Sequence, residues 1–170
     1  MSATLAHGEF LNIQEHGVFI TGPAGIGKST VALELLDRGH QLIADDVVFF
    51  QLKHGLVFGH CPDLLKNYLA LRDLGVLNVT RLYGQEATQP FYRLDLVIRL
   101  VQEYQPRPPS MQVVQAEHNL LGIPFPEIEI IATQHRNLAL VIETAVKNHI
   151  LYKQGNDANQ QLITKQQHII

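Results

Sequence analysis

The pattern of apolar and polar residues predicts a strand–helix–strand unit near the start of the chain. A short apolar run over residues 17–21 ends before Gly-Pro and predicts a buried strand. Residues 28–38 have the spacing of a helix, and Gly39 is placed to end it. A second short strand is predicted over residues 41–44.

The next segment departs from a simple alternation of strands and helices. Residues 47–52 and 56–58 are apolar apart from Gln51 and flank His54-Gly55, a pair that suits the tight turn of a β-hairpin. A proline can occupy the first turn of a helix, and residues 62–69, which begin with one, are predicted to be helical.

The second half of the chain predicts three strands and one long helix. Residues 93–101 alternate like a half-buried strand, and residues 111–114 and 127–131 are further candidate strands. Three prolines favour an extended path over residues 102–110, which we expect to form a loop at a sheet edge. Residues 137–154 have an apolar stripe and predict the helix. Helices therefore bracket a strand-rich middle, and the predicted fold class is α/β with a mixed sheet.

Length and composition are typical of one domain. The chain has 170 residues, of which 46% are hydrophobic and 17% charged, so it has enough apolar material for a core. We expect a single domain over residues 1–170, with a core from about residue 5 to residue 160 and a C-terminal tail over residues 161–170.

Charge and cysteine content exclude several classes of function. The net charge is −3, which provides no general basic field for nucleic acid or an anionic membrane. Cys61 is the one cysteine, so a disulfide framework and a cysteine-rich metal site are excluded. No apolar run approaches the ~20 residues that cross a bilayer, and the first residues have no signal-peptide pattern. We therefore expect a cytoplasmic protein.

The motif with the clearest chemistry is GPAGIGKS at residues 22–29, which matches the P-loop (Walker A) pattern between a predicted strand and a predicted helix. Its glycines let backbone N–H groups turn toward phosphate oxygens, and the helix N-terminus adds the positive end of its dipole. Lys28 places a cation on the outer phosphates, and Ser29 offers a hydroxyl to Mg²⁺. The predicted nucleotide-binding positions are Gly22, Pro23, Ala24, Gly25, Ile26, Gly27, Lys28, Ser29 and Thr30.

Two aspartates, Asp45 and Asp46, follow the predicted strand over residues 41–44. A carboxylate there can hold Mg²⁺ or orient an attacking group, and two adjacent carboxylates can divide these roles. Alternation along a strand would point the two side chains in opposite directions. Asp45 is the predicted metal ligand beside Ser29.

Arg136 is a candidate site residue because of its place at the start of the last predicted helix. The helix dipole disfavours a cation there. An anion held nearby, either a phosphate or a carboxylate, would offset this cost.

Two other classes of P-loop protein fit the sequence less well. The Asn-Lys-x-Asp motif by which GTPases read guanine is absent from the sequence. A small-molecule kinase fits the size and the Gly-Lys-Ser-Thr run, but an arginine-rich lid and a set of parallel strands are not clear. The small-molecule kinase stays open as an alternative.

Five segments occur in an order that is itself informative: LAHG at 5–8, the P-loop, RGHQLIADD at 38–46, LRDLGVLNV at 71–79 and RNLA at 136–139. Together they resemble the catalytic domain of HPr kinase/phosphorylase, the bacterial serine kinase that modifies the phosphocarrier HPr. The similarity extends from about residue 5 to residue 159. It implies a fold related to that of phosphoenolpyruvate carboxykinase and an ATP-dependent protein-serine kinase acting in the regulation of carbohydrate metabolism. HPr or an HPr-like protein would be the partner, ATP and Mg²⁺ the cofactors, and a homo-oligomer, often a hexamer, the assembly.

The resemblance also implies roles for single residues. Asp46 would be the general base that accepts the serine proton, and the acid in the reverse reaction, with His7 as a supporting catalytic group. Arg107 is the counterpart of a family arginine, and Arg72 keeps the arginine of the family's Glu-Ile-Arg-Gly signature.

Three departures from the family pattern matter for function. The metal-binding glutamate of Glu-Ile-Arg-Gly falls on Ala70, and Asp73 is the nearby candidate for a substitute carboxylate. The Pro-x-Arg-Pro-Gly-Arg-Asn segment, associated with phosphorolysis, is reduced to ATQHRN at 132–137. The family's longer members carry an N-terminal regulatory domain, whereas this sequence begins just before the catalytic domain. These departures favour kinase activity over phosphorolysis and keep a second reading open, an ATP-binding sensor with little turnover.

Overall fold

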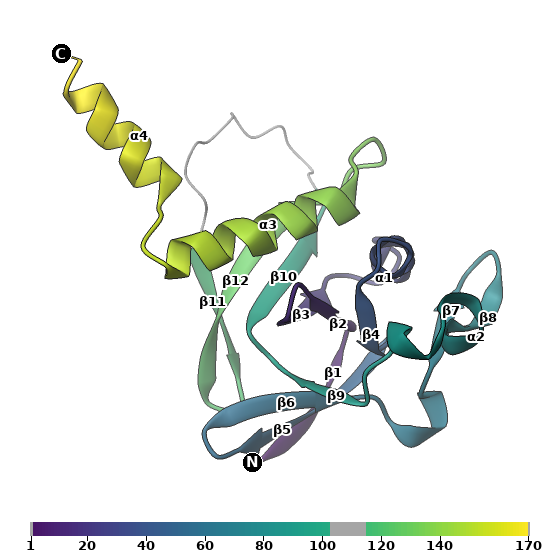
Figure 1. Ribbon diagram of the computed structural model, residues 1–170. Helices are drawn as coiled ribbons and strands as arrows, with labels where there is room; N and C mark the ends of the chain where they lie inside the picture. The colour runs from purple at the N-terminus through teal and green to yellow at the C-terminus, as the bar shows by residue number, and fades with distance from the viewer. Residues whose placement is uncertain (1, 103–114, 170) are drawn as a thin grey trace.

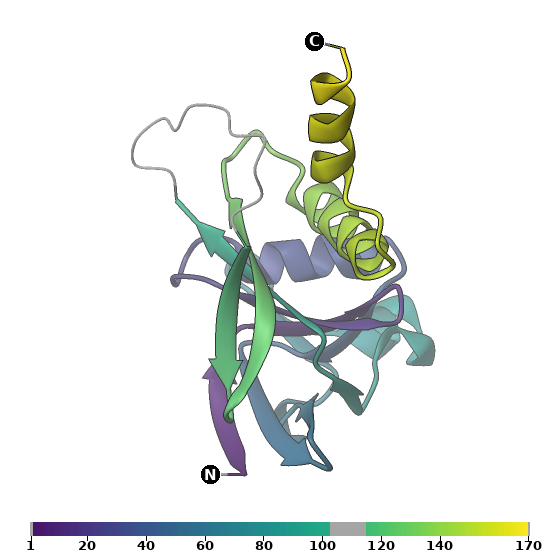
Figure 2. The same cartoon turned by 90° about the vertical axis from the view of Figure 1, so that its left-hand side faces the viewer.

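A computed structural model describes residues 2–102 and 115–169 of the chain. A six-stranded sheet forms the middle layer, with the helices α1 (Lys28–Asp37) and α3 (Leu138–Lys153) on one face. A four-stranded sheet covers the other face, as seen in the two views of Figures 1 and 2. The expected α/β class with a mixed sheet is confirmed.

The central sheet brings the ends of several strands to one edge. Its order is β11 (Gln115–Leu120), β12 (Ile123–Ile131), β10 (Leu96–Val101), β3 (His16–Thr21), β2 (Glu9–Ile13) and β4 (Gln41–Ala44). Strands β12, β10 and β3 are parallel, and β2 is antiparallel to both β3 and β4. The carboxyl ends of β3, β4, β10 and β12 therefore lie at the same edge as the start of β2, which is where ligands bind in open α/β sheets.

The smaller sheet contains the predicted hairpin. Its order is β1 (Ala3–His7), β5 (Val47–Lys53), β6 (Leu56–His60) and β9 (Phe91–Arg93). The turn between β5 and β6 has φ values of 51° at His54 and 78° at Gly55, the two left-handed residues that a type I′ hairpin turn requires. The sequence prediction of this hairpin is confirmed.

The helix predicted over residues 62–69 is wrong. The chain forms one 3₁₀ turn, η1 (Asp63–Leu65), and then a hairpin of β7 (Tyr68–Leu71) and β8 (Gly75–Asn78). Asn67 has a left-handed φ of 69°, which no helix interior tolerates, and only Leu69 of β7 is fully buried. The segment thus buries one leucine as part of a strand, and the apolar stripe of the predicted helix does not form.

Other boundaries also differ from the sequence prediction. The strand predicted over residues 93–101 is split, with β9 ending at Arg93 and β10 starting at Leu96. Leu96, Val97 and Ile98 are all buried because the sheet is covered on both faces, so β10 is not half-buried. The strand predicted over residues 127–131 is the second half of β12, while 111–114 lies outside the described residues, as does the loop predicted over 102–110 beyond its first residue.

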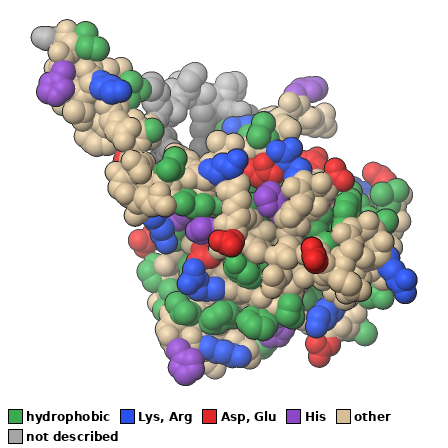
Figure 3. Space-filling view, viewed as in Figure 1, with side chains coloured by type: hydrophobic (Ala, Val, Ile, Leu, Met, Phe, Trp, Pro, Cys, Tyr) green, Lys and Arg blue, Asp and Glu red, His purple; other side chains and the backbone are tan. Residues whose placement is uncertain are grey.

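Two short helices and one 3₁₀ turn complete the described chain: α2 (Val79–Tyr83), α4 (Ala158–Gln167) and η2 (Gln85–Ala87). The expected C-terminal tail is helical up to Gln167, and α4 extends away from the rest of the molecule (Figure 1). Among the described residues, no helix is both long and apolar enough to cross a membrane. On the face seen in Figure 3, Lys and Arg side chains lie among Asp and Glu side chains instead of forming one basic patch.

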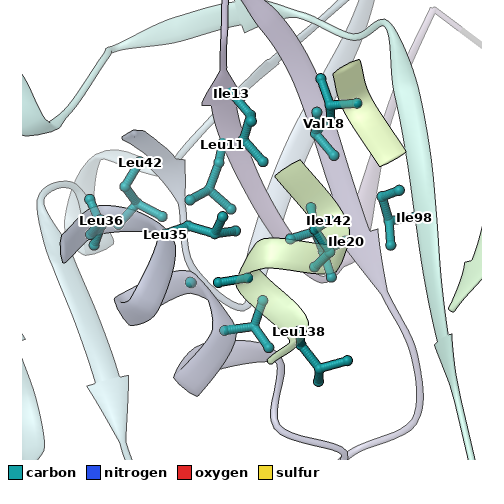
Figure 4. Packing of buried hydrophobic residues seen from close by; sticks show 14 of the residues in the cluster. Leu11, Ile13, Val18, Ile20, Leu35, Leu36, Leu42, Ile98, Leu138 and Ile142 are labelled. Carbon is teal, nitrogen blue, oxygen red and sulfur yellow. The ribbon is translucent and has the colours of Figure 1, made fainter. Parts of the chain in front are cut away.

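The core has two parts, one on each face of the central sheet. Figure 4 shows the helix-facing part, in which Leu35 from α1 and Ile142 from α3 pack against residues of β2, β3 and β10. In the other part, the rings of Phe10 and Phe19 meet the ring of Phe50 edge to face, at centroid distances of 5.4 and 5.1 Å. Burial on both faces holds the strand ends, and the groups attached to them, in fixed positions.

A buried carboxylate joins the two covering helices. Glu143 of α3 accepts hydrogen bonds from the guanidinium of Arg38, which follows α1, with Arg38 Nη2 at 2.8 Å from Oε2. The Nε2 atom of His40 lies 2.9 Å from Oε1 of the same carboxylate. The bond from Arg38, followed by that from His40, lowers the pKa of Glu143 to about 2 from an ordinary value of 4.5, despite its burial.

Replacement of Glu143 by glutamine should reveal this pairing as a pH dependence of stability. Because the pKa of Glu143 is lower in the folded protein, its contribution is present above pH 4.5 and lost as the pH falls toward 2. We expect Glu143→Gln to lower the free energy of unfolding by about 1.5–3 kcal/mol at neutral pH. Urea denaturation as a function of pH should show the difference from wild type closing across that acid range. Glu86→Gln, at an exposed carboxylate, is the control, and a difference that stays constant down to pH 2 would contradict the assignment.

Candidate functional site

The predicted P-loop joins the carboxyl end of β3 to the start of α1. Gly25 and Gly27 have left-handed φ values of 80° and 105°, which glycine adopts without strain. Gly27 is the N-cap of α1, and its carbonyl accepts the N–H of Val31 at 3.0 Å. The first N–H groups of α1 have no acceptor within the helix, so this end of the ten-residue helix favours an anion.

Lys28 lies against its own loop. Its Nζ donates to the carbonyl oxygens of Gly22 at 2.8 Å and Pro23 at 3.1 Å. The ammonium is therefore held against the carbonyl groups of the loop. Thr30, the last predicted nucleotide-binding position, is exposed on the first turn of the helix.

Three oxygen-bearing side chains meet next to the P-loop. Ser29 Oγ lies 3.3 Å from Glu9 Oε1 and 3.2 Å from Asp45 Oδ1. These residues come from the start of α1, the start of β2 and the end of β4, which the antiparallel pairing of β2 brings to one edge. Hydroxyl and carboxylate oxygens are the ligands that a hard cation such as Mg²⁺ prefers. The donor set of Ser29 and Asp45 therefore fits the predicted metal.

Glu9 is a site residue that the sequence analysis missed. It is 1% exposed, and its Oε2 atom is buried without a hydrogen-bond partner among the described residues. Burial, together with the neighbouring carboxylate of Asp45, raises the pKa of Glu9 above its ordinary value. The signal was present in the sequence, since Glu9, Leu11 and Ile13 alternate on one face of a strand and an acid in such an apolar row is unusual.

Asp45 also holds the β7–β8 hairpin in place. Its Oδ2 atom accepts the backbone N–H of Ala70 at 2.9 Å, and its side chain is buried. Position 70, where the resemblance implied a metal-binding glutamate, thus lies against Asp45. Its methyl side chain offers no metal ligand, and Asp73, the candidate substitute, lies exposed in the turn that follows β7.

A tight turn centred on Asp46 directs the side chains of the two aspartates apart. Asp46 has a left-handed φ of 66°, and the N–H of Val47 donates to the carbonyl of Asp45 at 2.7 Å. Asp45 is consequently buried, whereas Asp46 is exposed, so the two side chains occupy different environments as alternation suggested. His7 pairs with Val47 across β1 and β5, and the N–H of Gly8 donates to the carbonyl of Asp46 at 3.0 Å. The structure therefore brings the backbones of His7 and Asp46 together beside the P-loop edge.

The three arginines predicted for the site have different positions. Arg72 is exposed in the β7–β8 turn. Arg136 lies between β12 and α3, at the same sheet edge as the P-loop, and its Nη1 donates to the carbonyl of Ile131 at 3.2 Å. Arg107 lies outside the described residues. The groups that the fold gathers most closely are thus the P-loop, Glu9, Asp45 and the pair of Asp46 and His7.

Comparisons with known proteins identify a family to which the chain is similar. Residues 1–166 match the family described as HPr Serine kinase C-terminal domain. The chain is 40% identical over 167 residues to an HPr kinase/phosphorylase of Azoarcus sp., covering 96% of this chain and 53% of that protein. It is 39% identical over 168 residues to one of Bordetella petrii, again covering 96% of this chain and 54% of the relative. The chain therefore spans about half the length of the curated relatives it matches.

A solved structure gives the same picture of the fold. The structure of the Hpr(Ser) kinase/phosphatase from Coxiella burnetii superposes with a TM-score of 0.85 at 36% sequence identity. The match covers 94% of this chain and 98% of the other. The fold is thus shared over nearly the whole length of both chains.

Replacement of Glu9 by glutamine should stabilise the metal-free protein as the pH rises. Because the pKa of Glu9 is higher in the folded protein than the ordinary 4.5, the folded state retains a proton that the unfolded chain has lost. The wild-type protein therefore loses stability above pH 4.5, and Glu9→Gln avoids this loss. In urea denaturation with EDTA, we expect the variant to gain about 1–3 kcal/mol relative to wild type between pH 4.5 and 8. Glu15→Gln, in the turn at the other end of β2, should show no such trend, and equal pH slopes for Glu9→Gln and wild type would refute the effect.

Proposed function

The chain belongs to the HPr serine kinase C-terminal domain family, and we propose that it is an ATP-dependent protein kinase that phosphorylates a serine of HPr or an HPr-like protein. The observation that carries this proposal is the gathering of a P-loop, a buried oxygen cluster and an exposed aspartate at one sheet edge. Such an enzyme would act in the regulation of carbohydrate metabolism. The Ala132–Asn137 segment, ATQHRN, supports a reaction that runs mainly in the kinase direction.

The P-loop would hold the triphosphate of ATP. Residues 22–30 supply backbone N–H groups and the start of α1, which favour phosphate oxygens through hydrogen bonds and the helix dipole. Lys28 would exchange its contacts with the Gly22 and Pro23 carbonyls for contacts with the outer phosphates. A bound Mg²⁺, held by Ser29 and Asp45, would neutralise charge on the phosphates.

Asp46 is the better of the two aspartates for the role of general base. A serine that belongs to another protein must reach the base from outside, and only Asp46 is exposed. Asp45 is buried, and its two oxygens already face Ser29 and the N–H of Ala70. Asp46 would accept the serine proton during transfer, with His7 beside it as a supporting group.

The proposal also includes the three arginines, without assigning a contact to each. Arg72 and Arg136 are exposed and would turn toward a phosphate or an acceptor protein, with Arg136 giving up its bond to the Ile131 carbonyl. Arg107 keeps its proposed role as the counterpart of a family arginine. Assembly into a homo-oligomer, with a hexamer as the form implied by the resemblance, also remains a prediction.

One observation favours a second function. At Ala70, the family pattern has a metal-binding glutamate, and a weakened metal site would leave a protein that binds ATP without much turnover. An ATP-binding sensor that signals to a partner is therefore the alternative.

A phosphotransfer assay with radiolabelled ATP separates these functions. We expect the chain to label purified HPr on serine, because the exposed Asp46 lies beside the P-loop. Lys28→Ala should abolish labelling by removing the cation for the outer phosphates. Tight ATP binding without labelling of HPr or of proteins in a cell extract would favour the sensor, and a labelled metabolite would favour a small-molecule kinase.

The variant Asp46→Asn tests the assigned base. Removal of a general base typically costs about 10²–10⁴-fold in rate, and we expect a loss of that size in phosphotransfer. ATP affinity should be unchanged, since Asp46 is not among the predicted nucleotide-binding residues 22–30, and asparagine tolerates the left-handed φ of 66° at this position. Asp37→Asn, an exposed site at the end of α1, is the matched control. An undiminished rate in Asp46→Asn would remove it from the mechanism.

A further inference from the structure

Glu9 occupies a position where a carboxylate needs a partner. The residues that share its face of β2, Leu11 and Ile13, are fully buried in the helix-facing core. Glu9 itself is 1% exposed, and among the described residues no Lys, Arg or His forms an ion pair with it. A buried carboxylate without a compensating charge is costly, so such groups are usually paired or bind a metal.

Lys28, which precedes Ser29 in the P-loop, does not pair with Glu9. Lys28 directs its Nζ to two loop carbonyls, those of Gly22 and Pro23. Ser29 cannot satisfy the cluster either, because its hydroxyl has one proton to share between Glu9 Oε1 at 3.3 Å and Asp45 Oδ1 at 3.2 Å. Oε2 of Glu9 is buried and has no partner among the described residues.

Glu9 and position 70 lie on two sides of Asp45. The N–H of Ala70 fixes Asp45 Oδ2 at 2.9 Å, while Oδ1 faces the serine hydroxyl that also faces Glu9. Position 70 offers no side-chain oxygen, and Asp73 lies in the exposed turn beyond β7. Glu9 is therefore the second carboxylate that the described structure brings to Ser29.

We propose that Glu9 is a ligand of the divalent cation at this site, completing an oxygen-only set with Ser29 and Asp45. Two carboxylates and a hydroxyl suit Mg²⁺ or Mn²⁺, which keep several further positions for water and phosphate oxygens. This assignment rests on the proposed nucleotide-dependent function of the same edge. It gives this chain a metal site whose second carboxylate comes from β2 instead of the β7–β8 hairpin.

Binding of Mn²⁺ to the full chain tests the assignment without relying on activity. Mn²⁺ is titrated in the presence of ADP and followed by electron paramagnetic resonance, and ADP affinity is measured separately with EDTA. We expect Glu9→Gln to weaken Mn²⁺ binding about tenfold or more, because it removes a charged ligand while keeping the shape of the side chain. ADP affinity in EDTA should not fall below that of wild type, since the carboxylate of Glu9 offers neither an N–H donor nor a positive charge to the phosphates.

Controls separate a metal ligand from a buried neutral acid. Glu15→Gln removes the same charge at the opposite end of β2 and should leave Mn²⁺ affinity unchanged. Unchanged Mn²⁺ affinity in Glu9→Gln would overturn the proposal and leave Glu9 as a structural acid. If Glu9→Gln does not fold, the shorter pair Glu9→Asp and Glu9→Asn makes the same comparison, with binding expected only for the carboxylate.

The two proposals fail in different ways. If wild type binds Mn²⁺ and ADP in a Glu9-dependent manner but labels no protein, the kinase function fails and the metal assignment stands. If wild type phosphorylates HPr and Glu9→Gln binds Mn²⁺ as tightly as wild type, the metal assignment fails and the kinase function stands.

Discussion

The antiparallel pairing of β2 between β3 and β4 is the constraint on which the site depends. Strands β3 and β4 end at the edge where β2 begins, so the P-loop, Asp45 and Glu9 meet there although they are far apart in sequence. Burial of the sheet on both faces fixes these ends. A shift of β2 by one residue would turn Glu9 toward the other face and place Phe10 beside Ser29.

The turn at Asp45-Asp46 places two adjacent carboxylates in different environments, which suits them to different roles. A left-handed φ of 66° at Asp46 reverses the chain directly after β4, so Asp45 stays in the buried oxygen cluster while Asp46 faces solvent. The same turn starts β5, whose pairing with β1 places His7 beside Asp46. The second sheet thus has a role beyond covering the core, because it positions the exposed side of the proposed site.

Charge is distributed differently in the two buried clusters. Glu143 is held between Arg38 and His40, and its pKa is low because both partners favour the ionised form. Glu9 and Asp45 are two carboxylates that share one hydroxyl, and the pKa of Glu9 is high because the side chain is buried and lies beside the carboxylate of Asp45. The first cluster is complete within the protein and fastens α1 to α3, whereas the second is suited to receive a cation from outside.

The sequence by itself determined the local features. The P-loop, the hairpin around His54-Gly55 and the long helix α3 follow from glycine positions and short-range periodicity, which act over a few residues. Only the tertiary structure decided what residues 62–69 would form, because burial of Leu69 against distant elements outweighs a local helical pattern. It also decided that Glu9 joins Ser29 and Asp45, because the neighbours of a strand residue are set by which strands pair. Strand β2 pairs with β4 through residues that are 29 to 34 positions apart.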